Sequence, residues 1–185
     1  MYGLINISVK NLVTEKFGHQ KWEQIYERAG LENDIFLSNK TYDDQITYRL
    51  VTASSEVLGI SAEEILKEFG RYWVLNVAPT GYGKLLEAGG RTYDEFLLNL
   101  PSFHTRVMLI YPEVRPPNFE VSMLEDGRLR IVYGSARPGL LPFIFGLLDG
   151  LAERFKVTTD VQYVGQNQIN ATHEFIITKT SNAHI

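Results

Sequence analysis

The first two-thirds of the chain repeats apolar residues every three or four positions, which is the pattern of amphipathic helices. One stripe, built from Trp22, Ile25, Tyr26 and Ala29, ends at Gly30. A second covers residues 46–58 and ends at Gly59. Glycine commonly ends a helix, so these two stripes predict two helices with their last turns just before the glycines.

Two residue pairs in the same region have the spacing of a capping box, in which a hydroxyl side chain and a glutamate three residues later cap a helix start. The pairs are Ser61 with Glu64, and Thr92 with Glu95. Pro101 permits one more helix start, because proline is tolerated in the first turn. The pattern therefore predicts further helices after residues 61, 92 and 101.

After residue 112 the pattern changes to short segments typical of strands. Four strands are predicted at residues 119–124, 128–133, 157–164 and 173–179. The tripeptide at 125–127 predicts a hairpin turn, residues 140–155 a buried helix, residues 165–170 a turn, and residues 181–185 a frayed tail. This order predicts one domain of the α+β class over residues 1–185, with a helical subdomain at 1–60 and a mixed subdomain at 61–185.

Composition excludes several classes of protein. The chain has 185 residues, 44% of them hydrophobic, so it is long enough for a core and is not disordered. A net charge of −4 without a basic run argues against a nucleic-acid partner. The absence of cysteine removes disulfides and thiolate metal sites. We find no signal peptide and no apolar stretch long enough to span a membrane, so we expect a cytoplasmic protein without a membrane partner.

Three polar residues alternate at the end of an apolar run: Tyr133, Ser135 and Arg137. If the run is a strand, its period of two places all three side chains on one face. Two hydroxyl groups and a guanidinium fork would suit a pair of carboxylates or a phosphate. The alternative is the ordinary solvated face of a half-buried strand.

His104 lies upstream, on the apolar side of its predicted helix and next to Phe103. It can be a core histidine bonded to backbone. It can also be a ligand, although one histidine is too few for free zinc. One is enough for haem, because the porphyrin supplies the other four nitrogens. Haem also carries two propionates, for which an arginine with two hydroxyls is a fitting receptor.

The segment Tyr133-Gly-Ser-Ala-Arg137, together with His104 and Pro117, resembles the haem-nitric oxide/oxygen binding (H-NOX) family. That family includes the haem domain of soluble guanylate cyclase and stand-alone bacterial gas sensors, and the resemblance covers nearly the whole chain. It implies haem b between the two subdomains and His104 as the axial iron ligand. It also implies that Tyr133, Ser135 and Arg137 hold the propionates, and that Pro117 bends the porphyrin.

The resemblance places Ile5, Trp73, Pro142 and Phe143 on or near the distal side, opposite the axial histidine. Oxygen-binding members of the family have a tyrosine donor where this chain has Pro142 or Phe143, and neither can donate. We therefore expect an NO sensor that also binds CO. An oxygen-binding sensor or carrier stays open, because the indole N–H of Trp73 can donate. A peroxidase-type haem enzyme is the other alternative, although the distal set contains no acid–base group. A module of this architecture that binds no haem also remains possible.

The resemblance also bears on output. NO is expected to weaken the bond between iron and His104, so that the haem flattens against Pro117 and the two halves rotate. The sequence contains no catalytic segment, and we expect it not to be an enzyme. Its signal would pass to a separate protein, by analogy a histidine kinase or a cyclic-di-nucleotide enzyme.

Overall fold

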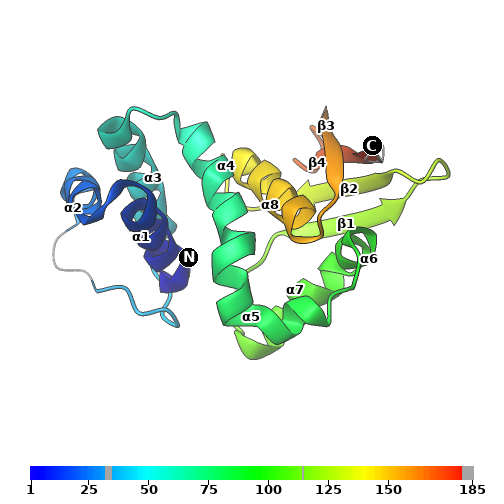
Figure 1. Cartoon of the computed structure of the whole chain (residues 1–185), viewed down its shortest axis with the longest axis horizontal. Helices are drawn as coiled ribbons and strands as arrows, with labels where there is room; N and C mark the ends of the chain where they lie inside the picture. Colours follow the sequence, from blue (N-terminus) through cyan, green and yellow to red (C-terminus); the bar gives the residue numbers. More distant parts are fainter. Residues whose placement is uncertain (32–34, 114, 181–185) are drawn as a thin grey trace.

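The computed structural model describes residues 1–31, 35–113 and 115–180 (Figure 1). Helices fill the first part of the chain: α1 (Gly3–Phe17), α2 (His19–Arg28), α3 (Asp44–Leu58), α4 (Ala62–Tyr72), the π-helical turn η1 (Trp73–Val77), α5 (Ala78–Glu87), α6 (Tyr93–Leu98) and α7 (Leu100–Ile110). None of the helices in the described ranges is long and apolar enough to cross a bilayer.

The second part is an antiparallel sheet with one helix inserted. Its strands are β1 (Asn118–Met123), β2 (Leu129–Gly134), β3 (Thr158–Gln166) and β4 (His173–Thr180), in the spatial order β1-β2-β4-β3. Helix α8 (Leu141–Arg154) connects β2 to β3 and lies between α4 and the sheet (Figure 1). The fold is therefore α+β, as the order of helical and strand patterns predicts.

Two hydrophobic cores hold these layers together. One is built by α1, α2, α3 and the residues from Phe69 to Val77. The other lies between the sheet, α8 and helices α5–α7. Trp73 and Phe143 pack against both cores. Helix α4 begins after the predicted subdomain boundary at residue 60, but its Phe69 and Tyr72 belong to the first core. The core therefore extends across this boundary, which stays a prediction.

Helices α4 and α8 cross at unusually close range. A Cβ added to Gly146 would lie 1.9 Å from the carbonyl oxygen of Lys67, and one added to Gly70 would lie 2.2 Å from that of Phe143. Only a residue without a side chain fits at such contacts. The two glycines thus set how close α8 lies to α4, and they place Phe143 beside Phe69 with ring centroids 5.3 Å apart.

Most predicted elements are confirmed within one or two residues. The capping box at Ser61 is complete, whereas at Thr92 only half of it forms, because the Glu95 carboxylate accepts from the backbone N–H of Arg91 instead. The pattern of apolar residues did not reveal α1, since the buried face of this helix includes the polar residues Asn6 and Ser8.

Two further differences concern local geometry. The π-helical turn and α5 were not predicted, because Pro79 and two glycines interrupt the helical pattern there. The turn predicted from residue 165 was wrong at its start: β3 continues to Gln166, and Gly165 pairs with Glu174. A register shift between Tyr163 and Gly165 leaves Val164 as the extra residue of a bulge. The tail predicted to fray, residues 181–185, lies outside the described residues.

Candidate functional site

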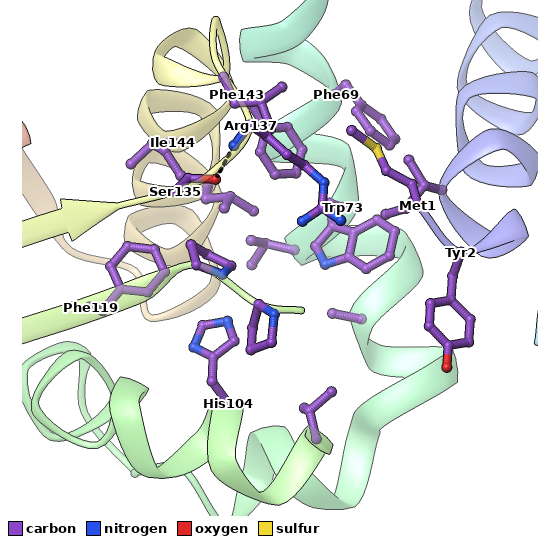
Figure 2. Close-up of a pocket in the computed structure, with 18 of the residues that line it drawn as sticks. Met1, Tyr2, Phe69, Trp73, His104, Phe119, Ser135, Arg137, Phe143 and Ile144 are labelled. Atoms are coloured by element: carbon purple, nitrogen blue, oxygen red, sulfur yellow. Dashed lines mark hydrogen bonds between the residues drawn. The ribbon is translucent and has the colours of Figure 1, made fainter. Parts of the chain in front are cut away.

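A cavity of about 470 Å³ lies between the two parts of the fold and has a mostly apolar lining. Its walls come from the start of α1, from α4, η1 and α7, from β1 and from α8 (Figure 2). The volume is in the range of pockets that bind cofactors and small molecules. Eight of the residues singled out in the sequence line it: Ile5, Trp73, His104, Pro117, Tyr133, Ser135, Arg137 and Phe143.

His104 projects from α7 into this cavity (Figure 2). Its Nδ1 lies 3.1 Å from the backbone carbonyl oxygen of Leu100, one helical turn earlier. A carbonyl only accepts, so Nδ1 carries the proton and donates, and Nε2 keeps its lone pair. Phe119 of β1 stacks on the imidazole, with ring centroids 5.3 Å apart and an interplanar angle of 18°.

The ionisation of His104 follows from its surroundings. Burial lowers its pKa below the ordinary 6.5, and the bond to Leu100 only partly opposes this. The imidazole is therefore neutral near pH 7, which is the form that ligates a metal. Among the described residues no group of three or more His, Asp or Glu side chains could hold a metal ion without a cofactor.

The polar triplet converges at one end of the cavity, although not by strand alternation. Strand β2 ends at Gly134, and Ser135 and Arg137 lie in the bend beyond it. Tyr133 and Ser135 both line the cavity, and the backbone N–H of Arg137 donates to Ser135 Oγ over 3.1 Å. Tyr133 is only 3% exposed, so the interpretation as a solvated strand face is wrong for this residue.

Burial raises the pKa of Tyr133, and Ser135 and the positive charge of Arg137 only partly oppose the rise. The phenol thus keeps its proton at neutral pH and can donate it in a hydrogen bond. Arg137 adds a fixed positive charge to the same part of the cavity lining. Two hydroxyl groups and a guanidinium are donors that can hold an anion with several acceptor oxygens, and we call Tyr133, Ser135 and Arg137 the anion receptor.

Arg137 is tied to the N-terminal part of the molecule by a residue that the sequence did not single out. Its Nε donates to Asp44 Oδ2 over 2.8 Å, and its Nη1 donates to the carbonyl oxygen of Arg115 over 2.9 Å. Asp44 opens α3 and also pairs with the N-terminal ammonium group. From the sequence, Asp44 is only an acidic residue in the first turn of a helix, and nothing in the pattern predicts that it pairs with Arg137.

The wall away from His104 is apolar. Trp73, Phe143 and Ile5 line it, and Phe69 contacts both larger rings, at centroid distances of 6.2 and 5.3 Å. Pro142 does not line the cavity and lies in the first turn of α8. A neutral imidazole, an anion receptor and an apolar wall around one cavity are the parts of a site for a flat, apolar cofactor with acidic groups.

Comparison with known proteins agrees with this class of site. The sequence profile of the Haem-NO-binding family matches residues 2–163. The chain belongs to this family.

Relatives with described functions are longer proteins. Soluble guanylate cyclase gcy-35 of Caenorhabditis elegans is 32% identical over the whole chain. Soluble guanylate cyclase 89Db of Drosophila melanogaster is 24% identical over 91% of it. The chain spans about a quarter of the length of these relatives, 28% of the first and 25% of the second.

Solved structures share the whole fold. An H-NOX protein from S. oneidensis in the Fe(II)NO state superposes with a TM-score of 0.88 over 98% of this chain and 100% of that one, at 18% identity. This likeness shows the fold alone. The Fe(II) unliganded H-NOX protein from K. algicida has a TM-score of 0.85 at 25% identity, covering 100% of each chain. The recognition from His104, Pro117 and the polar triplet is thus confirmed for family and fold.

Proposed function

We propose that this chain holds haem b in the cavity and senses a diatomic gas, with NO as the main ligand and CO as a second. The observation that carries the proposal is the state of His104, whose neutral imidazole offers Nε2 to an apolar cavity. When bound, haem supplies a ferrous iron with one position open to a diatomic gas. His104 would be its axial ligand.

The remaining groups fit the rest of the cofactor. Tyr133, Ser135 and Arg137 would hold the propionates, because they combine two hydroxyl groups with a positive charge at one end of the cavity. Pro117 lines the same cavity as His104 and would press on the face of the ring. The apolar lining would exclude water from both faces.

Selectivity among gases would come from the wall formed by Ile5, Trp73 and Phe143. Bound oxygen is polarised, so a hydrogen-bond donor increases its affinity for the iron, whereas NO binds ferrous iron without such a donor. Phe143 offers no donor, which favours NO. The indole of Trp73 also lines the cavity, and it supports the alternative of an oxygen sensor if its N–H reaches the ligand.

The output would be passed to another protein rather than to chemistry at this site. The relatives are guanylate cyclases by name and are about four times longer, so a sensing domain that regulates a distinct effector is consistent with them. We propose a histidine kinase or a cyclic-di-nucleotide enzyme as the effector, and a cytoplasmic location.

Absorption spectra of the reduced, haem-loaded protein under argon, in air and with NO test the proposal. We expect a five-coordinate spectrum under argon, no change in air, and a shift to a five-coordinate NO complex. A stable complex in air would support the oxygen alternative. Failure to take up haem would contradict both.

A further inference from the structure

Tyr133 is held by aromatic side chains on the two strands beside it. Its cross-strand partners are Phe119 on β1 and His173 on β4. The centroid of its ring lies 5.3 Å from that of Phe119 and 6.0 Å from that of His173. Direct cross-strand neighbours are the pairs that interact most strongly within a sheet. The orientation of the Tyr133 ring therefore depends on both neighbours.

His173 is in turn fixed from the edge of the sheet. The Tyr163 hydroxyl lies 2.9 Å from His173 Nδ1, and the two rings lie 5.9 Å apart. Tyr163 reaches His173 from a diagonal position, because its own strand partner is Phe175, whose ring is 5.6 Å away. Tyr163 is 38% exposed, so the contact starts at the surface. The three rings of Tyr133, His173 and Tyr163, which we call the tyrosine–histidine stack, run from the anion receptor to the sheet edge.

His173 is half-buried at the first position of β4, and its Nδ1 has a specific partner in the Tyr163 hydroxyl. A ring clamped by a hydrogen bond is a more rigid support than an apolar side chain free to change rotamer. Tyr133 lines the cavity, and its hydroxyl has to face the cavity for the anion receptor to form. A turn of the Tyr133 ring would move the hydroxyl away.

We propose that His173 is a positioning residue for the anion receptor: clamped by Tyr163, it holds the ring of Tyr133 so that the Tyr133 hydroxyl stays at the cavity and can bind a haem propionate. The inference rests on the proposed function. His173 does not itself line the cavity; it acts through Tyr133, which does. In the sequence His173 is only a histidine at a strand end, and nothing in the linear pattern indicates this role.

Three variants distinguish the contribution of the His173 ring from that of its hydrogen bond with Tyr163. His173→Ala removes the ring, His173→Phe keeps a ring but not the nitrogen, and Tyr163→Phe removes only the hydroxyl. His19→Ala, at an exposed histidine of α2, is the control. The readouts are the rate of haem transfer to excess apomyoglobin, the propionate bending bands in resonance Raman spectra, and the melting temperature.

We expect His173→Ala to speed haem transfer about threefold to tenfold, the range that corresponds to one aromatic pair, and to shift a propionate band. His173→Phe and Tyr163→Phe both lose the hydrogen bond and keep the rings, so both should lie between the wild type and His173→Ala. Unchanged transfer and bands in His173→Ala would overturn the inference. So would a lower melting temperature with normal bands, since that is a purely structural effect. Failure of the wild type to take up haem would overturn the proposed function as well.

Discussion

Nε of Arg137 lies 2.8 Å from Oδ2 of Asp44 and joins the end of the anion receptor to the first turn of α3. The two residues come from the two parts of the fold. The nearby Tyr48 hydroxyl adds a second link, because it donates to the Pro138 carbonyl oxygen over 2.9 Å. These two contacts connect the end of the anion receptor directly to α3.

The Asp44–Arg137 pair should contribute to stability in a pH-dependent way. Burial disfavours the Asp44 carboxylate, but the N-terminal ammonium group and Arg137 outweigh it, so its pKa lies below the ordinary 3.8. The contribution is present above pH 3.8 and is lost as the pH falls through the lower folded-state pKa. Because both side chains are partly exposed, Asp44→Asn should cost about 1 kcal/mol or less at pH 7. Urea unfolding at pH 7 and at pH 3 measures this; an equal cost at both pH values would contradict it.

His104→Gly should remove the axial ligand. We expect the reduced, haem-loaded variant to lose the spectrum of a histidine-ligated five-coordinate haem, and added imidazole to restore it by filling the space left by the side chain. Absorption and resonance Raman spectra record both effects, with His19→Ala as the control. A variant with the wild-type spectrum would show that another residue ligates the iron.

The buried imidazole should also make the haem-free protein less stable in weak acid. The folded-state pKa of His104 is below 6.5, so between these two values the unfolded chain binds more protons and stability falls with falling pH. One such group contributes a slope of at most about 1.4 kcal/mol per pH unit. His104→Leu should flatten the unfolding free energy between pH 7 and 5, whereas His19→Leu, at an exposed position, should not.

The crossing of α4 and α8 should tolerate no side chain at its glycines. Gly146→Ala brings a methyl group onto the Lys67 carbonyl and should destabilise the fold by about 1–3 kcal/mol, as overpacking does. Gly83→Ala is the matched control, because its Cβ meets nothing within 4 Å and alanine favours a helix by about 1 kcal/mol. Thermal and urea unfolding of the two variants should therefore differ in sign.

A donor placed on the apolar wall should change gas selectivity. Phe143→Tyr adds a phenol to the cavity lining and should raise the oxygen affinity of the reduced, haem-loaded protein about tenfold to a hundredfold, the worth of a hydrogen bond to a charged acceptor. Phe145→Tyr, in the same helix but packed on Phe175, is the control. Oxygen titration followed by absorption measures both; equal affinities would show that residue 143 does not face the ligand.

The sequence by itself determined most of the helices and all four strands, although not α1, the π-helical turn or α5. Local features depend on residues that are neighbours in the sequence, so the sequence pattern predicts them. Examples are the capping box at Ser61, the end of α3 before Gly59, the hairpin at 125–127 and the strand segments. The short motif Tyr133-x-Ser-x-Arg137 with His104 was enough for the family. The alternation of a strand predicted that Tyr133, Ser135 and Arg137 lie together, and all three do line the cavity. The reason was wrong, because β2 ends at Gly134 and Ser135 and Arg137 lie beyond it.

Only the tertiary structure decided which distant residues complete the site. Asp44 meets Arg137, and His173 supports Tyr133, because the helical part and β4 are brought to the cavity by packing between elements far apart in the chain. Helix α1 was not recognised for the same reason: its buried face includes Asn6, whose Oδ1 accepts a hydrogen bond from Thr47 of α3 over 2.7 Å. A polar residue whose partner lies far along the chain leaves no periodic signal, and so contacts of this kind have to be seen in three dimensions.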